Sequence, residues 1–129
     1  ILPFILAAGV MFWIAGFDTI YGTQDIEFDR NNKLYSIPAK FGLKNALIIA
    51  KMFHLIMMFF LVVFGLFTSL SLLYYIGLVI ATGLLILEHK IIKPSSIKRM
   101  NLASYNLNQI ISLTICIFGC LSIFIGGIL

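Results

Sequence analysis

Charged residues are scarce in this 129-residue chain, at 11% of the sequence, while hydrophobic residues make up 61%. Soluble domains carry roughly 25% charged residues. With a mean hydropathy of +1.09, the scarcity of charge excludes a soluble domain and predicts an all-α integral membrane protein. The length leaves room for about four helices of ~20 apolar residues joined by short loops.

Cysteine is also rare, and no disulfide framework is expected. Cys116 and Cys120 fall one helical turn apart in the last apolar run, where a disulfide has poor geometry, so buried thiols are predicted. No basic segment or small-residue cleavage site precedes the first apolar run, which argues against a signal peptide. The chain opens Ile1-Leu2-Pro3, and we expect a fragment, the C-terminal half of a longer protein.

The positive charge of +4 is confined to two clusters separated by the charge-free run Met52–Leu87. An even number of membrane crossings in this run places both clusters on one side, and an excess of Lys and Arg marks the cytoplasmic side. This distribution argues for the lipid bilayer as partner and against nucleic acid. The basic residues are Arg30, Lys33, Lys40, Lys44 and Lys51, then Lys90, Lys93, Lys98 and Arg99.

The apolar runs predict four transmembrane helices in a single domain over residues 1–129. Their expected bounds are about 1–24, 43–67, 70–92 and 100–128, with cytoplasmic loops over 25–42 and 88–99. The turn between the second and third helices is predicted at Thr68–Ser71, which lacks Lys and Arg as expected of the outer side. Along the last helix, small and polar residues share a face that predicts a packing seam, with polar cavity lining as the alternative for Asn101 and Asn108.

All three aspartates lie in one stretch, Phe17–Gly42. Asp18, Tyr21, Asp25 and Asp29 follow one another at spacings of three, four and four, which places them on one helical face. Acids grouped at the end of a hydrophobic segment are costly near a bilayer and call for a function. The pattern predicts a stripe of oxygen ligands at the mouth of a membrane cavity.

Paired carboxylates one turn apart can hold Mg²⁺, which is completed by waters and substrate phosphate oxygens. Lysines just beyond the pair would help to neutralise a phosphorylated leaving group, and the bilayer would take an apolar tail. A lipid diphosphate fits both requirements. Two alternatives are a plain solvated helix end and a transporter or ion-binding bundle with carboxylates at its cytoplasmic end, although a transporter predicts acids at mid-membrane and an internal repeat.

The run Asp18-Thr19-Ile20-Tyr21-Gly22-Thr23-Gln24-Asp25-Ile26-Glu27-Phe28-Asp29, with the later Ser36-Ile37-Pro38-Ala39-Lys40-Phe41-Gly42, resembles the second aspartate-rich motif of the UbiA superfamily. These are intramembrane prenyltransferases, and the similarity is greatest to the 4-hydroxybenzoate polyprenyltransferase branch. The similarity extends to Glu88-His89, Lys93-Pro94 and the Asn101 and Asn108 pattern.

The resemblance implies a nine-helix fold of which this chain forms the last four helices. It implies Mg²⁺ ligation by Asp25 and Asp29, with Asp18 and Tyr21 lining the cavity. The implied reaction transfers a polyprenyl group from polyprenyl diphosphate to an aromatic acid such as 4-hydroxybenzoate, in ubiquinone or menaquinone biosynthesis at the inner membrane. The first aspartate-rich motif is absent from these residues, so the resemblance assigns it to a missing N-terminal half.

Several other residues carry expectations of their own. Lys33 stands where the family more often has glycine, and Tyr35 where it often has lysine. Lys40 is assigned to diphosphate binding, with a cytoplasmic anchor as the alternative. His54 is expected to be a hydrogen-bonded core histidine, and His89 is left open between a structural and a functional role.

Overall fold

The computed structural model describes residues 1–92 and 97–126, with side chains described for 1–92 and 104–125. Within these ranges every regular element is helical. Four helical stretches are long and apolar enough to cross a membrane, which confirms the predicted all-α architecture. The elements are α1 (Leu2–Tyr21), the 3-10 helix η1 (Gly22–Asp25), α2 (Ile26–Asn31), α3 (Ile37–Phe67), α4 (Leu72–Ile91) and α5 (Ile97–Gly126).

The helix ends differ from the predicted bounds by a few residues. The first helix ends at Tyr21 instead of residue 24, and helical structure resumes over Ile26–Asn31, within a segment predicted to be a loop. The third and fourth spanning helices run over Leu72–Ile91 and Ile97–Gly126, so the predicted loop over 88–99 is shorter than expected at both ends. Lys93 and Pro94 lie outside the described residues.

α3 begins earlier than predicted, because Ser36 and Pro38 start a helix ahead of the spanning segment. The Ser36 side chain caps the helix by accepting a hydrogen bond from the Ala39 amide, and a proline fits the first turn. Gly42 then adopts φ 77° and ψ 166°, which interrupts the helix. A short helical segment therefore precedes the long apolar helix, within residues that were predicted to be a loop.

The turn between α3 and α4 lies where the sequence predicted it. Thr68 closes α3 by donating its hydroxyl to the Phe64 carbonyl at 2.6 Å. Ser71 precedes α4, and its amide donates to the Ser122 hydroxyl of α5 at 2.8 Å. The Ser122 hydroxyl thus pairs the Ser71 amide at the start of α4, where a helix leaves backbone amides without a partner of its own.

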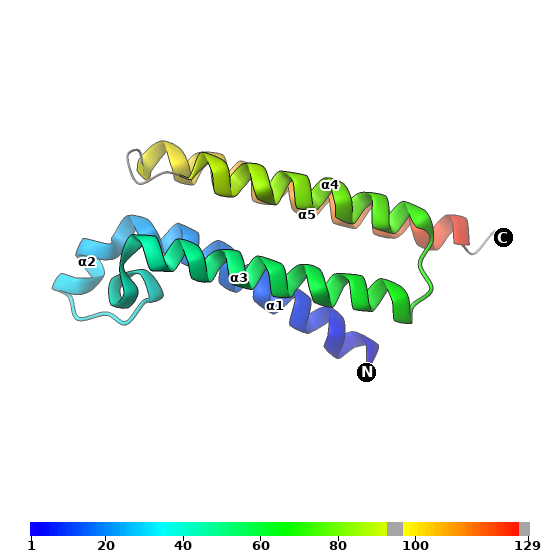
Figure 1. Cartoon of the computed structure of the whole chain (residues 1–129), viewed down its shortest axis with the longest axis horizontal. Helices are drawn as coiled ribbons and strands as arrows, with labels where there is room; N and C mark the ends of the chain where they lie inside the picture. The colour runs from blue at the N-terminus through cyan, green and yellow to red at the C-terminus, as the bar shows by residue number, and fades with distance from the viewer. Residues whose placement is uncertain (93–96, 127–129) are drawn as a thin grey trace.

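The helices are arranged as two pairs (Figure 1). α1 packs along α3, and α4 packs along α5. A shared apolar core joins the pairs and consists of Met57, Leu61, Tyr74, Leu78, Ala81, Leu85 and Ile111. The Tyr74 hydroxyl donates to the Leu61 carbonyl at 2.9 Å, which satisfies a buried polar group at the junction.

The predicted packing seam on α5 is wrong for this chain. Cys116 and Cys120 are exposed, not buried as predicted. Among the residues that the structure describes, no neighbouring atom lies within 4 Å of the position of an added Cβ at Gly119. The buried face of α5 instead carries Ile111 and Ser122. Asn101 lies outside the described side chains. Small residues favour close helix approach, but α4 meets a different face of α5, which carries Ser104, Ile111 and Ser122.

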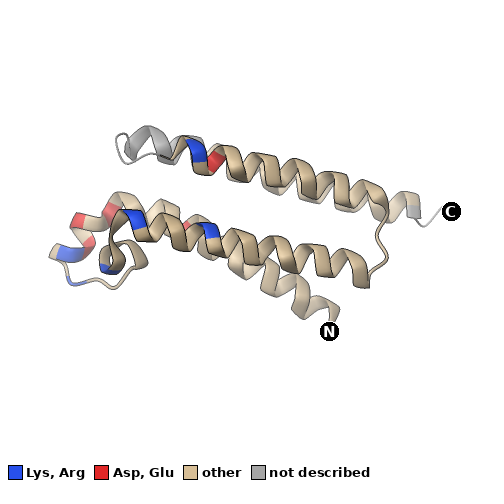
Figure 2. Cartoon of the chain, viewed as in Figure 1, with Lys and Arg blue, Asp and Glu red and all other residues tan. Residues whose placement is uncertain are grey.

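The described Lys, Arg, Asp and Glu residues gather in the half of the bundle that carries α2 (Figure 2). Both termini lie toward the other end (Figure 1). One basic cluster ends at Lys51 on α3, and the other begins at Lys90 on α4. Because α3 and α4 run antiparallel, Lys51 and Lys90 line the same hollow. The described basic residues of both clusters therefore lie in the same half of the bundle, while their side of the membrane stays a prediction.

Candidate functional site

The first two predicted site residues lie on the last turn of α1. Asp18 and Tyr21 are both exposed, and Tyr21 retains 49% of its accessible surface. The ring of Phe17 lies 6.0 Å from that of Tyr21 and 6.5 Å from that of Tyr105 on α5. Aromatic side chains from two helices therefore meet at the end of α1 where Asp18 stands.

The 3-10 helix η1 separates these two residues from the later aspartates. Thr23 is buried, and its hydroxyl donates to the Ile20 carbonyl at 2.6 Å, a local bond that favours a tight turn. A 3-10 helix turns about 120° per residue where an α-helix turns about 100°, so η1 rotates the following side chains by about 80°. The uninterrupted helical face that the spacing predicted is therefore broken at η1.

Asp25 and Asp29 lie on either side of the first turn of α2. Asp25 ends η1 and is exposed, whereas Asp29 is half-buried. The Ser36 hydroxyl donates to Oδ2 of Asp29 at 2.6 Å and accepts from the Ala39 amide at 3.2 Å. The amide of Leu34 also donates to the Asp29 carbonyl at 2.8 Å. Asp29 is thus tied to the start of α3, while the Asp25 carboxylate faces solvent.

The loop between α2 and α3 places Lys33 in a backbone conformation that favours glycine. Lys33 has φ 54°, in the left-handed region where a side chain costs roughly 1–2 kcal/mol and glycine does not. The neighbouring Arg30 donates from Nε to the Ala39 carbonyl at 2.8 Å. Backbone geometry at position 33 therefore favours glycine over lysine, whatever the side chain contacts.

Lys40 belongs to a basic hollow formed by the same loop. The hollow measures about 360 Å³ and is lined by Arg30, Lys33, Leu34, Tyr35, Ser36, Ala39 and Lys40. The Lys40 ammonium group lies 5.3 Å from the ring centre of Phe41, within the range of a cation–π contact. Three basic side chains therefore converge beside Ser36, which holds Asp29.

A second hollow, of about 230 Å³, opens between α1 and α5. It is lined by Val10, Trp13, Ile14, Phe17, Asn108 and Ser112. The Trp13 indole N–H donates to Oδ1 of Asn108 at 2.6 Å. Asn108 therefore lines a cavity, but a mostly apolar one and not the polar cavity that was predicted as an alternative. The hollow lies on the membrane side of Phe17, one residue before Asp18.

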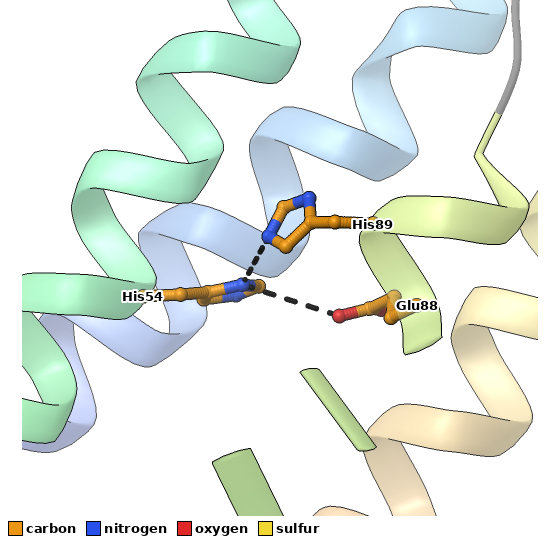
Figure 3. A group of neighbouring side chains, drawn as sticks. All are labelled: His54, Glu88 and His89. Atoms are coloured by element: carbon orange, nitrogen blue, oxygen red, sulfur yellow. Dashed lines mark hydrogen bonds and ion pairs between the residues drawn. The ribbon is translucent and has the colours of Figure 1, made fainter. Parts of the chain in front are cut away.

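Sequence reasoning did not predict a cluster in which two helices bring His54, Glu88 and His89 together. Their ligand atoms all lie within 4.8 Å of one another, and Figure 3 shows His54 on α3 facing the other two from α4. His54 bonds to His89 at 3.0 Å, which confirms the predicted hydrogen-bonded core histidine. A usable signal was present in the sequence, because His54 and Glu88 lie at similar distances from the Thr68–Ser71 turn and so at similar depths.

The fold and these sites define an all-helical membrane protein with an acidic and basic loop at one end of its bundle. Residues 1–110 match the model of the UbiA prenyltransferase family, and the chain belongs to this family. The family is one of prenyltransferases. Comparison with curated proteins and with solved structures gave no match.

Proposed function

We propose that this chain supplies one half of the metal–diphosphate site of a prenyltransferase. The enzyme would transfer a polyprenyl group from polyprenyl diphosphate to an aromatic acid such as 4-hydroxybenzoate, in quinone biosynthesis at the inner membrane, with the acidic loop on the cytoplasmic side. The observation that carries this proposal is the Asp25 and Asp29 pair beside the basic hollow, in a chain of the UbiA family.

The donor set of the acidic loop suits Mg²⁺. Asp25 offers an exposed carboxylate, and Asp29 offers Oδ1, which no hydrogen bond from the described residues reaches. Mg²⁺ is commonly bound through one or two carboxylates together with substrate phosphates, so a complete cage of protein ligands is not required. Bound between these aspartates and the substrate, Mg²⁺ would supply positive charge to the departing diphosphate.

The chain's own residues would position the diphosphate group. Ser36 fixes one carboxylate oxygen of Asp29 and leaves the other for the metal. Lys33, Lys40 and Arg30 line the adjoining hollow, and their cationic groups would stabilise phosphate oxygens as negative charge develops on them. Lys40 is the residue we assign to this contact, while Arg30 also bonds to the backbone of the loop.

The apolar surfaces near Asp18 would receive the rest of the substrates. The hollow lined by Trp13, Phe17 and Asn108 lies between two spanning helices, where a prenyl chain avoids water. Asp18 and Tyr21 stand at the same end of α1 and would contact the aromatic acid or the head of the prenyl chain. Exclusion of water protects a reactive allylic cation until the aromatic ring attacks it.

The test is an assay of the complete protein in detergent or lipid, with radiolabelled polyprenyl diphosphate, an aromatic acid and a titration of Mg²⁺. We expect Asp25→Asn and Asp29→Asn each to lower transfer by about 10²–10³, the usual loss when one electrostatic stabiliser is removed. Glu27→Gln is the matched control, because Glu27 is an exposed acid of the same helix, and it should change the rate less than twofold, within about 0.4 kcal/mol.

Full transfer by Asp25→Asn would refute the metal assignment. Product formation that does not depend on Mg²⁺ would refute it as well. If the protein instead moves an ion or solute across vesicles and forms no prenylated product, the ion-binding bundle is the correct interpretation.

A further inference from the structure

The His54, Glu88 and His89 cluster takes no part in the proposed prenyl transfer. His54 lies on α3, Glu88 and His89 lie on α4, and all three side chains point toward one another (Figure 3). His54 is 4% exposed and Glu88 is 1% exposed. An acid and two imidazoles buried inside a membrane bundle are costly unless they serve a function.

The distances within the cluster fit a shared metal ion. Nδ1 of His54 lies 3.0 Å from Nε2 of His89 and 4.0 Å from Oε2 of Glu88. Ligand atoms held about 2.0–2.1 Å from a tetrahedral zinc ion are separated by about 3.3 Å, which falls between the two observed values. Two imidazoles and one carboxylate form a donor set that first-row transition metals favour.

The charge of Glu88 also calls for a cation. Among the residues whose side chains the structure describes, no Lys or Arg lies within ion-pair distance of Glu88. The one titratable group within that distance is the His54 imidazole, with Nδ1 at 4.0 Å from Oε2 of Glu88. Buried carboxylates are paired with a charge, bind a metal or give up their charge. A divalent cation between Glu88 and the two histidines would satisfy this requirement directly.

Two further features resemble a built metal site. The Ser104 hydroxyl of α5 donates to Oε1 of Glu88, and such a bond orients a carboxylate ligand. A hollow of about 380 Å³ between α3 and α4 is lined in part by His54, His89, Lys51 and Lys90. This hollow gives an ion a path to the cluster and leaves room for a water or an anion as a fourth ligand.

We propose that His54, Glu88 and His89 form a site for one divalent transition-metal ion of the zinc type, separate from the acidic loop. The ligands come from both helix pairs, since α3 belongs to one and α4 to the other. The ion therefore fixes the α4 and α5 pair against the α1 and α3 pair, and Ser104 extends the connection to α5.

The experiment measures metal bound to the complete protein, purified in detergent with an affinity tag that lacks histidine. Elemental analysis should find about one zinc-type ion per chain. After removal of this ion with a chelator, Co²⁺ should restore one equivalent and give the visible absorption of a low-symmetry nitrogen and oxygen site. His89→Gln and Glu88→Gln should abolish this uptake, and Ser104→Ala should weaken the affinity about 10–100-fold.

The control variant is Asp25→Asn, which removes a ligand of the proposed Mg²⁺ site and should leave zinc or Co²⁺ uptake unchanged. Loss of uptake in Asp25→Asn with retention in His89→Gln would overturn the proposal, because the ion would then sit at the acidic loop. Wild-type protein that binds neither zinc nor Co²⁺ at micromolar concentration would overturn it as well, whether or not any variant folds, and would leave a neutral hydrogen-bond network as the role of the cluster.

Discussion

Ser36 performs two tasks with one hydroxyl, so its loss should loosen the acidic loop by an amount that can be worked out. In Ser36→Ala, the Ala39 amide loses its acceptor at 3.2 Å and Asp29 loses its donor at 2.6 Å. Loss of an N-cap costs about 0.5–2 kcal/mol. A hydrogen bond to a charged carboxylate contributes about 1.5–3 kcal/mol. We take the lower value, about 1.5 kcal/mol, because Ser36 and Asp29 are only half-buried.

The two losses together amount to about 2–3.5 kcal/mol, which corresponds to a roughly 30- to 300-fold change in a local opening equilibrium. Hydrogen exchange measured by mass spectrometry on peptides covering 34–42 reports this opening, because the Ala39 and Lys40 amides both bond to Ser36. Ser36→Thr keeps the hydroxyl and should exchange nearly as the wild type does.

The far end of the bundle provides a second control. Ser71→Ala removes a bond to Ser122 at 2.9 Å and should leave exchange over 34–42 unchanged. Exchange in Ser36→Ala that stays within threefold of the wild type would show that the Asp29 and Ser36 contact does not hold the loop. Ser36 would then not be the residue that holds the Asp29 carboxylate in position for a metal ion.

Two further substitutions test backbone and packing. Lys33→Gly should leave the free energy of unfolding unchanged or raise it by up to about 1 kcal/mol, because position 33 has φ 54°. Lys40→Gly lies within a helix and should lower the free energy of unfolding by about 1 kcal/mol. Equal losses in the two variants would contradict the assigned geometry. Gly16→Ala should lower the free energy of unfolding by about 1–3 kcal/mol, because the new Cβ would overlap the His54 ring. In Gly83→Ala the new Cβ meets no atom of the described residues within 4 Å, so this variant should be neutral or stabilising. Unfolding in mixed detergent measures all four free energies, and a neutral Gly16→Ala would show that His54 is not confined by α1.

Much of the architecture could be predicted from hydropathy alone. A lipid-spanning helix needs a long apolar run, so the four runs and the polar turn at Thr68–Ser71 determined the order of the helices. Ser36 and Pro38 likewise carried a recognisable helix start. The end of α1 was less predictable, because the choice of a 3-10 turn depends on a bond from one buried threonine to a carbonyl three residues earlier.

Contacts between helices were the main limit of sequence reasoning. The stripe of small residues on α5 predicted a seam, yet Gly119 meets no neighbour within 4 Å, because the rotation of a helix about its axis depends on its partners. For the same reason the meeting of His54 with Glu88 could not be read from either helix separately. The acidic loop was easier to predict, because its residues are neighbours in the sequence.

Gly42 has a mechanical consequence for the rest of the chain. Its backbone turns between the short helical segment that holds Lys40 and the long segment that holds His54. Rotation about this one residue can absorb a displacement of the loop, because glycine adopts backbone angles that other residues rarely reach. The buried histidine deeper in α3 then keeps its position, so events at the two sites stay mechanically independent.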